Sequence, residues 1–239
     1  MSAYRPSPFA NLTPVVKNLI IINVIFFIAT ELNVLGHFFD MTTWLSAYYF
    51  NSPNFRLWQI ISYMFMHAGI AHIFFNMFAL FIFGPTLEYT MGSKRFLQYY
   101  FVAGIGALLL QWGVQALEVH HIVGTFTIPN GDVRPYADYP GIEKLADIYT
   151  GAVLGASGSI FGLLLAFGVL FPNVELMILF IPVPVKAKWA VTGYILLELF
   201  SGVGQFSGDN VAHFAHLGGA LFGFILLKIW RMRGPNNFF

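Results

Sequence analysis

Long apolar runs separated by short polar stretches dominate this chain and predict a series of membrane-spanning helices. The hydrocarbon core of a bilayer requires about 20 predominantly apolar residues of helix. Six runs of roughly this length, the fifth needing some extension, occur at residues 17–35, 58–87, 96–117, 154–171, 189–201 and 211–230. The pattern predicts an all-α, polytopic membrane protein of six spans, forming a single domain over residues 1–239.

Two apolar stretches need separate interpretation. Residues 178–185 contain Pro182 and Pro184, which break a helix, so we expect an interfacial or re-entrant stretch before the fifth span. The first run resembles a signal peptide in its position. However, Glu31 and Asn33 follow directly, without a small-residue cleavage pattern, which favours an uncleaved helix.

The composition agrees with a membrane protein and excludes several other classes. Apolar residues make up 57% of the chain and charged residues only 10%, with a mean hydropathy of +0.69. The absence of cysteine excludes a disulfide framework, a thiolate nucleophile and a cysteine metal site. A net charge of +1 without a run of Lys or Arg argues against a nucleic-acid partner.

The basic residues predict the orientation of the spans. Lys and Arg near span ends remain cytoplasmic, and nine of the twelve fall on the side of both termini. Residues 1–17 and 231–239 are therefore predicted to be cytoplasmic tails, and residues 118–150 a long outer loop. Within that loop, residues 142–149 have the pattern of a short amphipathic helix.

A serine and a histidine lie inside two of the apolar runs. Ser157 occurs in Gly-Ala-Ser-Gly at residues 155–158, and His216 in Ala-His-Leu-Gly-Gly at residues 215–219. Polar groups in lipid are costly unless partnered, which makes this pair a candidate site. Each residue is predicted to lie in the outer half of the membrane, no more than about 10 Å below the outer end of its helix. We expect Ser157 to act as nucleophile and His216 as general base.

Small residues flank both members of the pair. Gly158 and Gly162 are four residues apart, as are Ala215, Gly219 and Gly223. Such spacing lets two helices approach more closely than usual, as a hydrogen bond between Ser157 and His216 would require. Taken alone, the glycines could equally serve ordinary helix packing.

The second span carries further polar residues at helical spacing. His72 and Asn76 are four residues apart, so their side chains share one helical face at a depth similar to that of Ser157. Together with the backbone N–H of Ser157, these donors can form an oxyanion hole. The alternative is that both side chains bond to neighbouring backbone within the helix.

These motifs, in this order along the chain, resemble those of the rhomboid intramembrane serine proteases. The resemblance covers roughly residues 56–230. It rests on residues 155–162 and 215–223, and on a third group at the second span: His67, His72, Asn76, Gly84, Glu88 and Gly92.

The resemblance implies a six-helix bundle that hydrolyses peptide bonds in or near the transmembrane segments of its substrate proteins. It implies a dyad of Ser157 and His216 without an acidic third member, and an oxyanion site of His72, Asn76 and the Ser157 amide. Residues 33–57 resemble the membrane-embedded first loop of the family. The fifth span and the loop after it would form a lateral gate.

In that first loop, four aromatic residues suit a membrane interface: Trp44, Tyr48, Tyr49 and Phe50.

Two positions depart from the pattern of many family members. Phe161 occupies a position where part of the family has Tyr, and we expect it to pack against the His216 imidazole. Gln59 occupies a position where many relatives have Arg, and we expect altered loop anchoring.

The remaining polar residues are predicted to support the fold. Glu198 can touch the cavity, but a structural or gating role is favoured over a catalytic one, and His213 and His67 are assigned supporting roles. Glu88 lies sixteen residues beyond His72, too far for the same site, and is expected to tie the spans to the inner loop.

Two other functions compete with the protease. One is a proteolytically inactive relative that binds transmembrane partners. The other is a metal site or transporter using His72, His213 and His216, which is disfavoured because no H-E-x-x-H pair or obvious carboxylate ligand accompanies them. No cofactor or metal is therefore expected, and the expected partners are transmembrane proteins and the lipid bilayer. The absence of a transit peptide favours a prokaryotic plasma membrane.

Overall fold

A computed structural model describes residues 12–36, 39–177, 183–204 and 212–234. Six helices of 14 or more residues occur in this part of the chain and correspond to the six predicted spans. They are α1 (Pro14–Gly36), α4 (Ile70–Met91), α5 (Ser93–Val123), α7 (Ser157–Leu170), α8 (Ala187–Gly204) and α9 (His213–Ile229). The predicted all-α, polytopic membrane fold is confirmed.

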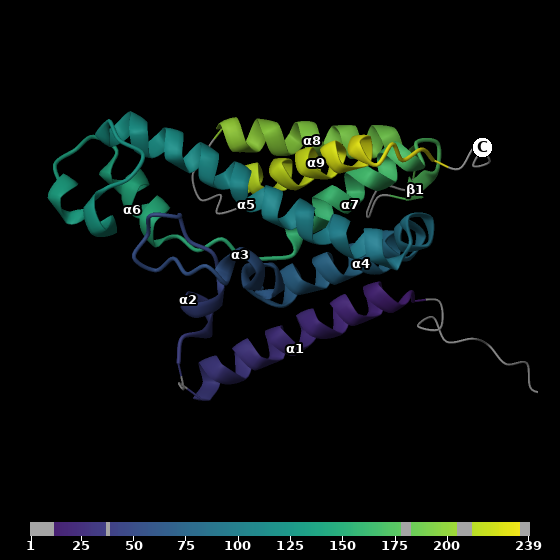
Figure 1. Cartoon of the computed structure of the whole chain (residues 1–239), viewed down its shortest axis with the longest axis horizontal. Coiled ribbons are helices and arrows are strands. Elements are labelled where there is room, and N and C mark those ends of the chain that lie inside the picture. The colour runs from purple at the N-terminus through teal and green to yellow at the C-terminus, as the bar shows by residue number, and fades with distance from the viewer. Residues whose placement is uncertain (1–11, 37–38, 178–182, 205–211, 235–239) are drawn as a thin grey trace, which may run out of the picture.

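Helix α7 packs against four other long helices, α4, α5, α8 and α9. Helices α5, α7 and α9 pack against one another, α1 packs on α4, and α8 packs on α7 and α9 (Figure 1). By length and composition, α1, α4 and α5 can each cross a membrane, while α7 and α9 are shorter apolar helices. The helix that begins with Ser157 is therefore covered by neighbours on several sides.

The outer surfaces of the two edge helices are apolar. On α1, Ile21, Ile25 and Ile28 are exposed, and on α8 Phe200 and Val203 are exposed. In a bilayer these residues contact lipid, which accounts for apolar side chains on both faces of each helix.

The second predicted span is divided in the structure. Short helices α3 (Gln59–Ser62) and η2 (Tyr63–Phe65) come first, Met66 is extended, and α4 begins only at Ile70. The prediction of a continuous helix over residues 58–87 was wrong. As a result, His67 lies in the linker, and His72 lies in the first turn of α4.

A two-stranded hairpin precedes α8. Strand β1 (Glu175–Met177) pairs antiparallel with β2 (Pro184–Lys186). Residues 178–182 of the stretch predicted to be interfacial or re-entrant lie outside the described residues. So do the loop at 205–211, part of the predicted gate, and most of the two predicted tails.

The predicted outer loop forms an ordered unit. Helix α5 continues to Val123, and η3 (Pro129–Gly131), η4 (Arg134–Tyr136) and α6 (Ile142–Thr150) follow. The amphipathic helix predicted at 142–149 is confirmed as α6. A separate apolar cluster joins this loop to the first loop through Tyr49, Val119, Ile128, Leu145, Ile148 and Tyr149. We call residues 46–55 and 119–150 together the outer lobe.

The first loop contains α2 (Met41–Leu45) and is anchored by Gln59. The Gln59 side chain is fully buried, and its Nε2 donates to the carbonyl oxygens of Thr43 and Asn54, both at 3.1 Å. The four aromatic residues predicted to suit an interface divide into two pairs. Trp44 and Phe50 are exposed, whereas Tyr48 and Tyr49 are buried in the protein.

Candidate active site

Ser157 and His216 are within hydrogen-bond distance of each other. Ser157 is the first residue of α7, and its Oγ lies 2.9 Å from Nε2 of His216, in the first turn of α9. With Nε2 unprotonated, the serine hydroxyl donates to it. A hydroxyl in this position can pass its proton to the imidazole as it attacks a carbonyl carbon.

Small residues allow this approach of α7 and α9. A Cβ atom added to Gly219 would overlap the carbonyl oxygen of Gly158. One added to Gly162 would lie 2.6 Å from the Ala103 side chain and 3.1 Å from the Gly219 oxygen. The close crossing predicted from the glycine spacing is present in the structure.

Phe161 fixes the plane of the imidazole. Its ring is stacked on that of His216, with centroids 4.2 Å apart and an interplanar angle of 7°. Phe161 in turn contacts Tyr194 of α8, with centroids 4.9 Å apart. The predicted packing of Phe161 on His216 is confirmed, and Tyr194, which carries a hydroxyl, contacts Phe161.

The second nitrogen of His216 faces a carboxylate. Nδ1 of His216 lies 2.9 Å from Oε2 of Glu198, and Nδ1 of His213 lies 2.7 Å from the same oxygen. Glu198 belongs to the buried face of α8, which also contains Val191 and Gly202. The carboxylate therefore lies between the two helices and contacts two histidines of α9.

A cavity of about 840 Å³ opens beside the serine. Its lining includes His72, Asn76, Ser157, Phe161, Tyr194 and His216. All four predicted site residues therefore border one space, whose size is typical of ligand-binding cavities.

His72 presents a second imidazole to the cavity. Its Nδ1 accepts a hydrogen bond from the Ala68 N–H at 3.3 Å, which leaves the ring proton on Nε2. A Cβ atom at Gly155 would lie 2.8 Å from His72 Nε2 and 3.6 Å from Ser157 Oγ. The His72 Nε2–H and the Ser157 hydroxyl thus both lie close to Gly155.

Asn76 and the amide of Ser157 complete the set of donors. Asn76 Nδ2 donates to the His72 carbonyl oxygen at 3.1 Å, so the within-helix bond considered as an alternative is present. Its second amide hydrogen has no partner among the described residues. The Ser157 N–H lies at the amino terminus of α7, where N–H groups lack helical partners and the helix dipole favours negative charge.

The chain matches a known protein family over most of its length. The Rhomboid domain family matches residues 54–233. This chain is a member of the rhomboid family. The predicted resemblance is confirmed.

Individual rhomboid relatives come from several kinds of organism. An uncharacterised mitochondrial rhomboid protein of Schizosaccharomyces pombe is 26% identical over 86% of this chain and 59% of its own length. Mitochondrial rhomboid protein 1 of Saccharomyces cerevisiae is 29% identical, over 69% of this chain and 39% of its own. YdcA of Bacillus subtilis, named as a candidate rhomboid protease, is 28% identical over 76% and 71%.

These relatives also bear on the organism of origin and on the share of each relative that this chain covers. The chain spans only about 59% and 39% of the two yeast relatives. Because mitochondrial proteins stand beside a bacterial one, the predicted prokaryotic origin is not borne out.

Glu198 separates this site from the dyad implied by the rhomboid resemblance. That resemblance implied no acidic third member, and sequence reasoning favoured a structural or gating role for Glu198. The structure instead joins its carboxylate to His216. One signal was available, because Glu198 is the only acidic residue in the apolar run 187–204.

The other supporting residues lie in different surroundings. His67 is buried edge-to-face against His72, with centroids 5.0 Å apart, and neither ring nitrogen has a hydrogen-bond partner in the described part of the chain. Glu88 accepts hydrogen bonds from the N–H groups of Val15 and Val16 and from the Ser93 hydroxyl. The prediction that Glu88 ties the spans to the inner loop is confirmed.

The rhomboid site also contains one possible set of metal ligands. Ligand atoms of Glu198, His213 and His216 all lie within 4.8 Å of one another. This set includes the Glu198 carboxylate, which the sequence analysis did not count as a metal ligand, and it does not include His72. Both histidine contacts converge on one carboxylate oxygen at hydrogen-bond distance, which describes a hydrogen-bonded network.

Proposed function

We propose that this rhomboid protein is an intramembrane serine endopeptidase that hydrolyses peptide bonds in or near transmembrane segments of membrane proteins. The observation that carries the proposal is the 2.9 Å contact between Ser157 Oγ and His216 Nε2 at the edge of a cavity. The name of the Bacillus subtilis relative, which includes the word protease, supports it.

The reaction begins with proton transfer within the pair. His216 Nε2 takes the Ser157 proton as Oγ bonds to the carbonyl carbon of the substrate, giving a tetrahedral intermediate. The His216 imidazolium then protonates the leaving amine, and the peptide C–N bond breaks to leave an acyl-enzyme. A water molecule, deprotonated by His216, hydrolyses this ester and restores the serine.

Three hydrogen-bond donors at the cavity stabilise the negative charge of each tetrahedral intermediate. His72 contributes Nε2–H, Asn76 its second amide hydrogen, and Ser157 its backbone N–H. Loss of one such donor typically lowers kcat by about 10²- to 10³-fold.

The cavity walls favour an apolar substrate. Beyond the polar residues, the lining includes Phe75, Phe78 and Ile82 from α4 and Leu176 and Met177 from β1. A transmembrane segment unwound near its scissile bond offers apolar side chains to such a surface, whereas a soluble polar peptide does not.

The arrangement of charges supports an orientation for the protein. Nine of the twelve basic residues fall on the side of both termini, so we infer that the termini share the cytoplasmic face. The first turns of α7 and α9, with Ser157 and His216, then lie toward the opposite face.

Cleavage of a panel of single-pass transmembrane reporters by purified protein in detergent tests the function. Wild-type protein should cleave at least one reporter, and Ser157→Ala or His216→Ala should lower the rate on the order of 10⁴-fold or more. Ser159→Ala is the matched control, because Ser159 Oγ donates to the Tyr100 carbonyl at 2.7 Å and faces away from the site.

Three results would reject the proposal. Cleavage that persists in Ser157→Ala requires another nucleophile. Cleavage that stops on strong chelation but survives Ser157→Ala favours the metal site. A folded wild-type protein that cleaves no reporter but retains transmembrane partners favours the inactive relative.

A further inference from the structure

We infer that Glu198 is a positioning residue for His216, so that the site operates as a Ser157–His216–Glu198 triad and not as a dyad. The inference rests on the proposed roles of Ser157 and His216. It assigns a third functional residue, from a different helix, to the same reaction.

The contacts form a continuous line through the imidazole. Ser157 Oγ lies 2.9 Å from Nε2, and Glu198 Oε2 lies 2.9 Å from Nδ1. A neutral imidazole carries one N–H, and an ionised carboxylate can only accept hydrogen bonds. Glu198 therefore holds the proton on Nδ1, which leaves the lone pair of Nε2 directed at the serine hydroxyl. This is the tautomer that a general base requires.

The position of Glu198 on α8 also argues for a specific role. Glu198 is 6% exposed, whereas the flanking Leu197 and Leu199 are 57% and 45% exposed on the outer surface of the helix. Helix α8 thus directs its acidic side chain inward among apolar neighbours. A carboxylate in a membrane interior is costly unless it is partnered, and the two partners of Glu198 among the described residues are histidines of α9.

His213 strengthens the placement of the carboxylate. Its Nδ1 lies 2.7 Å from the same Glu198 oxygen, so Oε2 can accept one hydrogen bond from each ring. Since His213 and His216 are three residues apart on α9, these two contacts restrict the carboxylate to one orientation between the helices. The stacking of His216 on Phe161 restricts the ring in the remaining direction.

During the reaction the carboxylate acts on charge as well as orientation. When Nε2 accepts the Ser157 proton, His216 becomes an imidazolium with N–H groups on both nitrogens. The adjacent carboxylate stabilises this cation and keeps the Nδ1 proton on His216. The proton then leaves from Nε2 to the departing amine, and Glu198 stays ionised throughout.

Glu198→Gln tests the inference with little change in shape. The new amide can donate to Nδ1, which favours the tautomer with its proton on Nε2 and blocks proton acceptance from Ser157. We expect kcat to fall about 10²- to 10⁴-fold with KM within about twofold of wild type. The rate of fluorophosphonate labelling of Ser157, which needs no substrate segment, should fall by a similar factor. Glu198→Asp keeps a carboxylate and should recover at least about tenfold of the lost kcat.

Glu88→Gln provides the matched control. Glu88 is also a buried carboxylate on a helix, but its hydrogen bonds go to Val15, Val16 and Ser93. The same substitution there should lower the thermal unfolding temperature and leave kcat per folded molecule within about threefold of wild type.

Several outcomes would overturn the inference. They are a kcat for Glu198→Gln within about threefold of wild type, a loss confined to KM, or equal losses for Glu198→Gln and Glu198→Asp. If Glu198→Gln does not fold, the ¹⁵N shifts of His216 in Ser157→Ala test the inference instead. The triad requires the ring proton on Nδ1, and a proton on Nε2 alone would exclude it. The two proposals fail separately. An active Ser157→Ala rejects the proposed serine protease, whereas an inactive Ser157→Ala beside an active Glu198→Gln rejects only the triad.

Discussion

At the scale of residues, contacts within one helix or between glycine-marked helices were predictable and others were not. His72 and Asn76 share a face because four residues separate them, and the glycine spacing indicated that Ser157 could meet His216. The Glu198 contact depends on how α8 is rotated against α9. Since α8 is apolar around most of its circumference, its sequence pattern does not reveal which face is buried.

Gly155 is predicted to be required for the geometry of the oxyanion site. Its φ of +128° is strained for any other residue, and a Cβ atom there would lie 2.8 Å from His72 Nε2. Gly155→Ala should displace His72 from Ser157 and lower kcat about 10- to 100-fold, in line with partial loss of an oxyanion donor. Reporter cleavage measures this effect.

Gly113→Ala on α5 is the control for Gly155→Ala. An added Cβ at Gly113 has no neighbouring atom within 4 Å. This variant should keep wild-type kcat, and a Gly155→Ala enzyme with undiminished kcat would contradict the role given to Gly155.

At the scale of elements, hydropathy predicted which segments are helical better than where each helix ends. All six long helices fall on predicted apolar runs. The break at Met66 and the start of α4 at Ile70 were missed, because apolar residues continue through them. Within a lipid-facing bundle, local backbone hydrogen bonds set such ends, and these leave little trace in hydropathy.

The crossing of α7 and α9 is predicted to tolerate no side chain at Gly219. Gly219→Val would drive its side chain into the Gly158 carbonyl and separate Ser157 from His216. We expect destabilisation of about 1 to 3 kcal/mol from overpacking, together with at least about a hundredfold loss of cleavage. Thermal unfolding in detergent and reporter cleavage measure the two effects.

Gly193→Val on α8 is the corresponding control, because a Cβ atom there meets nothing within 4 Å. It should change neither quantity appreciably. Equal effects of the two valine substitutions would show that the α7–α9 crossing has no special requirement.

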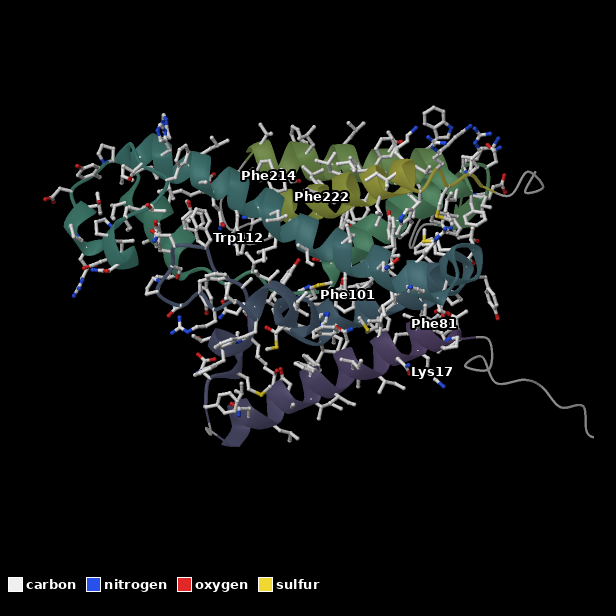
Figure 2. All side chains as sticks on the ribbon, in the orientation of Figure 1. Lys17, Phe81, Phe101, Trp112, Phe214 and Phe222 are labelled. Atoms are coloured by element: carbon white, nitrogen blue, oxygen red, sulfur yellow. The ribbon has the colours of Figure 1, made fainter. Side chains whose placement is uncertain are left out.

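At the scale of the whole molecule, long-range hydrogen bonds join the outer lobe to the helix bundle. Trp112 of α5, labelled in Figure 2, donates to the Tyr48 carbonyl of the outer lobe at 2.9 Å. Within the lobe, the Tyr149 hydroxyl donates to Asn51 Oδ1 at 2.7 Å. Ala47 and Val153 exchange backbone hydrogen bonds shortly before Ser157. Sequence periodicity predicted α6 but not these pairings, since they join residues up to 106 positions apart, as in Ala47 and Val153.

The orientation of the molecule can be tested directly, because the chain contains no cysteine. Lys94→Cys and Asp138→Cys would each introduce a single thiol at an exposed position, at opposite ends of the bundle. In intact cells, a membrane-impermeant maleimide should label Asp138→Cys and should label Lys94→Cys only after permeabilisation. The reverse pattern would contradict termini on the cytoplasmic side.

The most direct measurement of the central claim is the location of a fluorophosphonate adduct by mass spectrometry of the purified, folded protein. The account predicts one adduct, on Ser157, that persists in Ser159→Ala and is nearly abolished in His216→Ala. A folded protein without an adduct, an adduct on another residue, or labelling of Ser157 that is independent of His216 would contradict it.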